Sequence, residues 1–231
     1  MQSSRILAAG SWRRAFGEIL LIVVGILIAL AINAWYEDVI EREQEEQILA
    51  QMATTLSEDL VAIRDAHTTI LNVDEGISSF IKVIESQSIS PGQIATGIHL
   101  LNRFVTIQIR YAPYETLKAK GMGLISNQLL REKITTVYED EIPNLVENSL
   151  IDRGLSRNHI LPAMLKHFRI DESDRWTPKD PSDAGWQTEM ATLGRYRVGT
   201  FRGFYEPSFE RTMSQMEELV TALNDELKVS E

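Results

Sequence analysis

One uninterrupted apolar segment near the N-terminus limits what this chain can fold into. Residues 17–35 read GEILLIVVGILIALAINAW, and from Ile19 to Ile32 there is no charged residue and no proline. At about 1.5 Å per residue, a helix over 16–36 is about 31 Å long, which is close to the thickness of the hydrocarbon core of a bilayer. The sequence therefore predicts a single transmembrane helix over residues 16–36.

The charges on the two sides of this segment predict its orientation. Arg5, Arg13 and Arg14 precede it without any acid, whereas six acids and one arginine follow it within 37–46. By the positive-inside rule, residues 1–15 are cytoplasmic and residues 37–231 form an extracytoplasmic domain. Without these arginines and Glu18, the chain keeps 20 basic and 32 acidic residues, a net charge of −12. We therefore expect no binding of nucleic acid or anionic lipid headgroups by that domain.

Two export signals compete with a permanent anchor. Ala29-Leu30-Ala31 has the small-x-small form of a signal peptidase site, and Arg13-Arg14 resembles the start of a twin-arginine signal. However, the apolar run continues past Ala31 to Trp35, and Glu18 lies where a twin-arginine signal is apolar. A retained anchor is the favoured interpretation.

Small and polar residues recur on one face of the predicted span. At about 100° per residue they lie within an arc of about 80°: Glu18, Ile22, Gly25, Ala29 and Asn33. A carboxyl and an amide group are costly against lipid, and Gly25-x-x-x-Ala29 allows another backbone to approach closely. This face is therefore a candidate helix–helix interface in the membrane. The alternative is that Glu18 and Asn33 lie at headgroup depth and are hydrated there.

This same segment resembles that of a known family. The run G-E-I-L-L-I-V-x-G-I-L-I-A-L-x-I-N-x-W behind a basic N-terminus is similar to that of a bacterial family of single-span proteins of unknown function. The likeness is most specific at Gly17, Glu18, Gly25, Ala29, Asn33 and Trp35. A weaker likeness covers Tyr114-x-x-Leu117-x-x-x-Gly121, Leu124-Ile125 and Leu130-Arg131. The resemblance implies an anchor in the bacterial inner membrane with a helical periplasmic domain, and it implies no activity.

Beyond residue 36 the apolar residues recur at helical spacing. Eleven positions advance by an average of 3.5 residues: Leu49, Met52, Leu56, Leu60, Ile63, His67, Ile70, Val73, Ile77, Ile81 and Ile84. This spacing is typical of a coiled coil or of a long bundle helix. It predicts a stalk helix over 37–86, either unbroken or broken once near Gly76.

Proline and glycine divide the remainder into shorter predicted elements. Helices are expected at 94–109 after Ser90-Pro91, at 113–120, at 127–153 with a kink at Pro143, and at 156–168 after Gly154. The stretch 104–111 is rich in branched and aromatic residues, but it lies within a helical period. Two prolines and five acids in 171–186 predict a surface loop or lid.

Together these elements predict an all-α fold. One transmembrane helix continues into a bundle of about four long helices, with the bundle over 90–170 and the C-terminal helices over 187–229. In the last stretch, helical spacing places Met190, Leu193 and Tyr196 in the core, followed by Phe209, Met216 and Leu223.

The residues that usually carry chemistry are sparse. There is no cysteine, which excludes disulfides and thiolate metal sites. His159 and His167 could share one helix face and join Asp171 and Glu172 in a weak metal site, but exposed or hydrogen-bonded histidines are favoured. The same holds for His67, and we expect the acidic run 139–141 to be solvated. We therefore expect no cofactor and no enzymatic activity.

Two clusters combine basic and aromatic residues within an acidic domain. The first is Arg110, Tyr111, Tyr114, Lys118 and Lys120, and the second is Arg195, Tyr196, Arg197, Arg202 and Phe204. Such clusters can bind a small anion or a peptide carboxylate, so the first is a candidate docking surface. The alternative is that these long side chains cover a turn between helices.

These features favour a membrane-anchored structural or assembly subunit. Its partners would be lipid and either further copies of the chain or a larger membrane protein complex. An extracytoplasmic ligand-binding sensor is the alternative, and because only about 15 residues precede the span, such a sensor would signal through a partner protein.

Overall fold

The structure is a computed structural model that describes residues 6–86 and 89–230, with side chains described over 16–86 and 89–228. Arg5 lies outside the described residues, and Arg13 and Arg14 lie outside the described side chains. The chain divides into two units, Met1–Ile48 and Leu49–Glu231. Helix α1, Ile6–Glu85, contributes residues to both units, which are described separately below.

In the first unit, the apolar segment of α1 is helical, and its side chains are not covered by other described residues. Every side chain from Phe16 to Tyr36 is exposed. The mean hydropathy of its most apolar 18 residues is 2.5, and none of that window is buried. A helix satisfies its own backbone hydrogen bonds and therefore tolerates a lipid environment. By length and composition this helix could cross a membrane.

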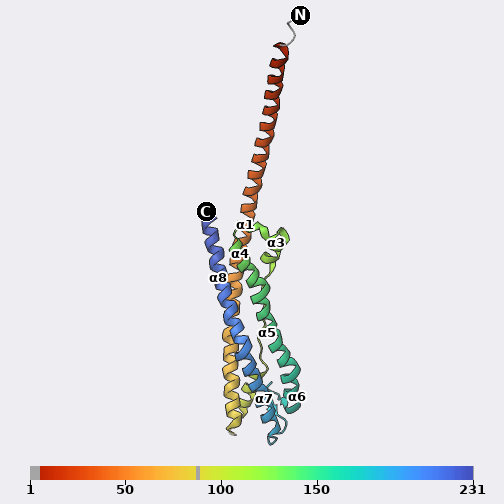
Figure 1. The fold of residues 1–231 in the computed structure, drawn as a ribbon. Helices are drawn as coiled ribbons and strands as arrows, with labels where there is room; N and C mark the ends of the chain where they lie inside the picture. Colours follow the sequence, from red (N-terminus) through yellow and green to blue (C-terminus); the bar gives the residue numbers. More distant parts are fainter. Residues whose placement is uncertain (1–5, 87–88, 231) are drawn as a thin grey trace. The chain divides into compact units, whose positions relative to one another are not determined.

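In the second unit, the described residues form an all-α domain, as predicted (Figure 1). Its three long helical runs are the part of α1 from Leu49 onward, a run over 128–167 and a run over 185–230. The second run comprises α4 (Gln128–Thr135), η2 (Thr136–Glu141), α5 (Ile142–Leu155), η3 (Ser156–Ile160) and α6 (Leu161–His167). The third comprises α7 (Gly185–Thr200), η4 (Phe201–Tyr205) and α8 (Glu206–Ser230).

Shorter elements connect the long runs. They are α2 (Pro91–Leu101), α3 (Ala112–Lys120), the 3₁₀ turn η1 (Met122–Leu124) and the antiparallel strands β1 (Phe168–Ile170) and β2 (Trp176–Pro178). Strand β1 ends directly before the segment 171–186 that was predicted as a surface loop or lid, and β2 lies within that segment. Helix α7 begins at Gly185, two residues earlier than expected.

The predicted apolar seam of α1 is confirmed as the centre of the core. Ten of its eleven members from Leu49 to Ile84 are buried, and His67 is half-buried and stacks on Phe209 of α8 with ring centroids 5.0 Å apart. The helix runs unbroken through Gly76, so the unbroken alternative holds. From α8, Phe209, Met216 and Leu223 complete this core, as their spacing predicted.

Prolines inside the long runs follow π-helical turns. Pro143, Pro162 and Pro207 each lie two residues after η2, η3 and η4, respectively. A proline cannot donate to the carbonyl four residues earlier, and its ring clashes with that carbonyl in an α-helix. A π turn widens the backbone by one residue and relieves this conflict. The helix that was predicted to end at Gly154 therefore continues through η3 into α6, which contributes to a bundle of three long runs rather than four.

The helix predicted over 94–109 is shorter in the structure. A capping box starts α2, because the Ser90 side chain accepts from the Gln93 amide and the Gln93 side chain accepts from the Ser90 amide. The helix ends at Leu101, and residues 103–111 are not helical. Their branched and aromatic residues favour an extended backbone, and Ile107 is buried.

Candidate functional site

The predicted interface of the span remains open to solvent in the structure. Glu18, Ile22, Gly25 and Ala29 are exposed, and a Cβ added at Gly25 would meet nothing within 4 Å. Asn33 is also exposed, but its Nδ2 donates to Glu37 Oε1 at 2.8 Å within the same helix. The described part of the chain therefore makes no contact at position 25 that requires a glycine.

The first basic cluster joins the non-helical segment to α1. Arg110 Nε donates to Asp59 Oδ1 at 2.8 Å, its amide donates to Asp59 Oδ2 at 3.0 Å, and its Nη1 pairs with Glu58. Asp59 is buried, so it depends on these donors for its charge to be tolerated there. Arg110 thus fastens residues 103–111 to α1.

The tyrosines of this cluster pack inside the domain. Tyr114 is 3% exposed and stacks on Tyr138 of η2 with centroids 4.5 Å apart, and Tyr111 contacts the edge of the same ring. The Tyr114 hydroxyl donates to Glu139 Oε1 at 2.7 Å, which lowers the pKa of Glu139, and Lys118 Nζ at 3.2 Å adds to this effect. Tyr114 therefore holds α3 on η2 and offers almost no surface to a partner.

The docking role of the first cluster stays a prediction. Lys120 is exposed at the last residue of α3, and Lys118 is exposed beside Tyr114. Charge reversal at Arg110 would break its bonds to Asp59 as well as any contact with a partner. Such a variant therefore cannot test docking by itself.

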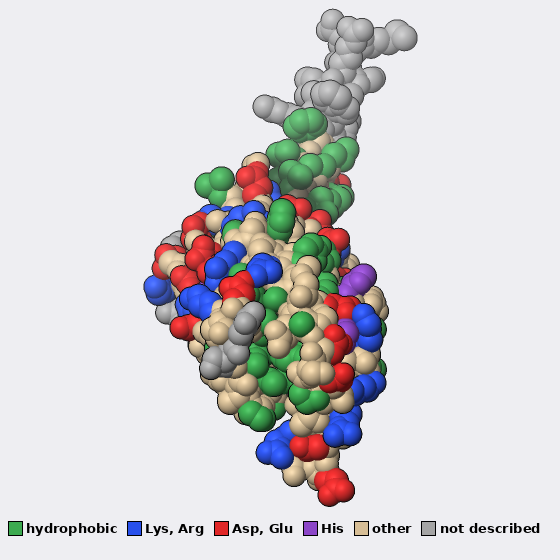
Figure 2. All heavy atoms as spheres, turned by 90° about the horizontal axis from the view of Figure 1, so that it is seen from below, with side chains coloured by type: hydrophobic (Ala, Val, Ile, Leu, Met, Phe, Trp, Pro, Cys, Tyr) green, Lys and Arg blue, Asp and Glu red, His purple; other side chains and the backbone are tan. Residues whose placement is uncertain are grey.

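The second basic cluster divides into buried and exposed members. Arg202 bonds Asp74 Oδ2 through Nε at 2.9 Å, and Arg195 pairs with Glu85. These pairs tie the third run to α1, and oppositely charged side chains also lie next to one another on the face drawn in Figure 2. Tyr196 and Phe204 are 63% and 71% exposed. Tyr196 was predicted to be a core residue, and that prediction is wrong.

Arg197 is the one member of this cluster that lies in the core. It is 3% exposed, and its Nε and Nη2 donate to the two carboxylate oxygens of Asp152 on α5 at 2.9 and 2.8 Å. Its Nη1 donates to the carbonyls of Leu100 and Leu101 at 3.2 and 2.6 Å, and its Nη2 to that of Arg103. The guanidinium therefore satisfies the carbonyls at the end of α2 and joins α2, α5 and α7.

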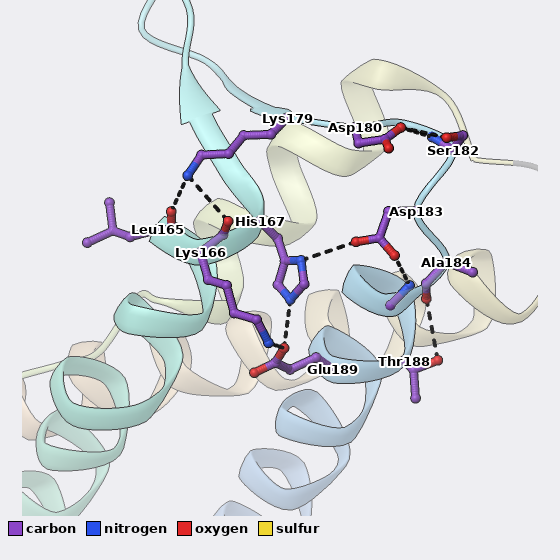
Figure 3. A network of polar contacts seen from close by, with 11 residues as sticks. Leu165, Lys166, His167, Lys179, Asp180, Ser182, Asp183, Ala184, Thr188 and Glu189 are labelled. Atoms are coloured by element: carbon purple, nitrogen blue, oxygen red, sulfur yellow. Dashed lines mark hydrogen bonds and ion pairs between the residues drawn. The ribbon is translucent and has the colours of Figure 1, made fainter.

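The structure does not bring together the four residues of the weak metal site, which was the less favoured interpretation of the sequence. The described residues include no group of three or more histidine, aspartate and glutamate side chains that could hold a metal ion. His167 Nε2 instead lies 2.7 Å from Glu189 Oε2, which also accepts from Lys166, and His167 Nδ1 lies 3.6 Å from Asp183 (Figure 3). His159 lies on η3. Asp171 Oδ1 accepts hydrogen bonds from the backbone amides of Ser173 and Arg175.

The acidic side chains over 139–141 do not share a common partner. Glu139 accepts from Tyr114 and Lys118, Asp140 is exposed, and Glu141 Oε2 lies 2.7 Å from Arg211 Nε. Successive residues of a helix point in different directions, so their carboxylates do not converge on one cation.

A hollow that no sequence motif indicates lies at the end of α2. Its cavity volume is about 290 Å³, and it is lined by His99, Asn102, Arg103, Phe104, Met164 and Trp176. These residues come from α2, the segment after it, α6 and β2. They are far apart in the sequence, so no local motif could have revealed the hollow.

Comparisons of the chain with models of protein families, with curated proteins and with solved structures find no match. The likeness of residues 17–35 to a bacterial single-span family therefore stays a prediction.

Proposed function

We propose that this protein is a membrane-anchored structural or assembly subunit. Its helix over 16–36 crosses the bacterial inner membrane, residues 1–15 are cytoplasmic, and the helical domain is periplasmic. The subunit associates through the face of its span with further copies of itself or with a larger membrane protein complex.

The observation that carries this proposal is the exposure of the apolar helix over 16–36. No side chain between Phe16 and Tyr36 is buried by the described part of the chain. Burial of apolar surface is favourable by about 25 cal/mol per Å², so this helix requires a membrane or a partner. Lipid can cover the isoleucine and leucine side chains. The glycine at position 25 and the carboxyl of Glu18 fit a neighbouring helix better than lipid.

The construction of the domain supports a structural role. Ion pairs join the third helical run to α1 at Arg64–Glu217, Arg195–Glu85 and Arg202–Asp74, and Arg197 joins the same run to α2 and α5. A domain tied at many points along its length can hold a bound protein in one place.

Replacing Gly25 by Leu should abolish association in the membrane, because the larger side chain would keep the two backbones apart. Val24→Leu is the matched control, since Val24 is exposed on another face of the same helix turn. The measurement is chemical crosslinking followed by native mass spectrometry of the full-length protein after mild detergent extraction. We expect oligomer or complex for the wild type and for Val24→Leu, and monomer for Gly25→Leu. Equal behaviour of the two variants would contradict the proposed interface.

A reporter enzyme that is active only outside the cytoplasm should be active when fused after Glu231. This result follows from the arginines before the span and the acids after it. A reporter that fluoresces only in the cytoplasm, fused at the same position, serves as the complement. Fluorescence of that second fusion would show that the proposed orientation is inverted.

A further inference from the structure

We propose that the hollow at the end of α2 is a binding site for a small aromatic carboxylate. All of its lining residues belong to the second unit, so the proposal is independent of association through the span. Arg103 and His99 would bind the carboxylate, and Trp176 and Phe104 would contact the ring.

The first argument is the charge of the hollow. The lining includes an arginine and a histidine and no carboxylate, although the chain after the span carries a net charge of −12. Neither the Arg103 nor the His99 side chain has an ion-pair or hydrogen-bond partner among the described residues. By contrast, Arg110, Arg197 and Arg202 are each bound by a carboxylate. The planar guanidinium of Arg103 can therefore donate two parallel hydrogen bonds to the two oxygens of a carboxylate.

A second basic residue reinforces this charge. The guanidinium carbon of Arg157 on η3 lies 5.7 Å from the centre of the Phe104 ring, in a cation–π contact. Like Arg103, it has no carboxylate partner among the described residues. Three basic side chains, Arg103, His99 and Arg157, therefore lie in the lining or against it, which favours an anionic ligand.

The second argument is the shape and polarity of the hollow. Trp176, Phe104 and Met164 supply an apolar wall beside the basic residues. A cavity of about 290 Å³ suits a ligand of the size of a single substituted ring. A ring that stacks on an aromatic side chain contributes beyond its burial alone. The combination of an apolar wall and one basic edge fits an aromatic carboxylate better than an inorganic anion.

The third argument is that the aromatic wall is held in position. Trp176 is on β2, and residues on both sides of this hairpin are fixed to helices, as Figure 3 shows. Lys179 Nζ donates to the carbonyls of Leu165 and Lys166 at 2.8 and 3.3 Å, and His167 bonds Glu189 of α7 at 2.7 Å. A ligand would therefore meet a preformed wall and would lose little free energy in ordering it.

The experiment is isothermal titration calorimetry, in which sodium benzoate is titrated into the full-length protein in detergent micelles. The same titration into empty micelles is the blank. We expect a dissociation constant below about 1 mM. Benzamide, which lacks the charge, and acetate, which lacks the ring, should each bind at least about tenfold more weakly. These comparisons use the wild-type protein and do not depend on the folding of a variant.

Variants then locate the site. Arg103→Gln and Trp176→Leu should each weaken benzoate binding by at least about tenfold. Arg169→Gln is the matched control, because it removes the same charge from an exposed position on β1 that does not line the hollow. The proposal is overturned if the dissociation constant for benzoate exceeds about 1 mM, if benzamide binds equally well, or if either lining variant keeps the wild-type affinity.

Discussion

Arg197→Ala should destabilise the helical domain by about 3–5 kcal/mol, which is a large part of the stability of a domain of this size. The substitution leaves the buried carboxylate of Asp152 without its counter-ion, and it removes the donor to the carbonyls at the end of α2. A buried charge and unsatisfied carbonyls each carry a desolvation cost that water cannot offset. The measurement is urea denaturation of the full-length protein in detergent, followed by circular dichroism.

Arg195→Ala is the control for this experiment. Arg195 is on the same helix and also pairs with a carboxylate, but both partners of the Arg195–Glu85 pair are about half exposed. An exposed ion pair contributes about 0–1 kcal/mol. If the two variants lost the same stability, the burial of Arg197 would not be the cause, and its assigned role in joining α2, α5 and α7 would be wrong.

Gly97→Ala should destabilise the domain by about 1–3 kcal/mol, although alanine is the better helix former. A Cβ at position 97 would lie 2.0 Å from Phe80 Cδ2 and 2.2 Å from its Cγ. These atoms are close to the backbone of α1, and Phe80 is buried, so the ring has little room to move. Removing the ring should relieve the clash. In the Phe80→Ala background, Gly97→Ala should therefore cost less than in the wild type, as a double-mutant cycle would measure.

Gly199→Ala serves as the comparison on α7. A Cβ there would meet nothing within 4 Å, so the substitution should stabilise the domain by up to about 1 kcal/mol through helix propensity alone. Destabilisation of similar size at both glycines would show that the close approach of α2 to α1 is not responsible.

The large features of the fold could be predicted from local patterns. The apolar run over 17–35 has the length of a span whatever surrounds it, because hydrophobic burial depends on composition and length. The seam from Leu49 to Ile84 was equally legible, because its period of 3.5 residues persists over many turns and defines one face of a helix. Both predictions depend on residues that are neighbours along one helix.

The rotational phase of α7 was ambiguous in the sequence. Met190, Leu193 and Tyr196 have helical spacing, but so do Met190, Gly194, Arg197 and Phe201, and the second set faces the core. Tertiary packing decided between them. Gly194 allows α7 to approach α1 so closely that an added Cβ would lie 3.1–3.2 Å from Ile77 and Ile81. This approach turns Arg197 inward, where Asp152 and the end of α2 compensate its charge.

By itself, then, the sequence determined the apolar segment over 17–35, the helical class and the face of α1 that forms the core, because each follows from the composition, length or periodicity of one segment. Only the tertiary structure decided which arginines are buried, that the helix continues through Gly154, and that residues from α2, α6 and β2 surround one hollow. These outcomes depend on partners that are distant in the sequence: Asp152 lies 45 residues from Arg197, and the carbonyl of Leu101 lies 96 residues from it. No local pattern encodes such pairs, since their energies arise only when separate helices come into contact.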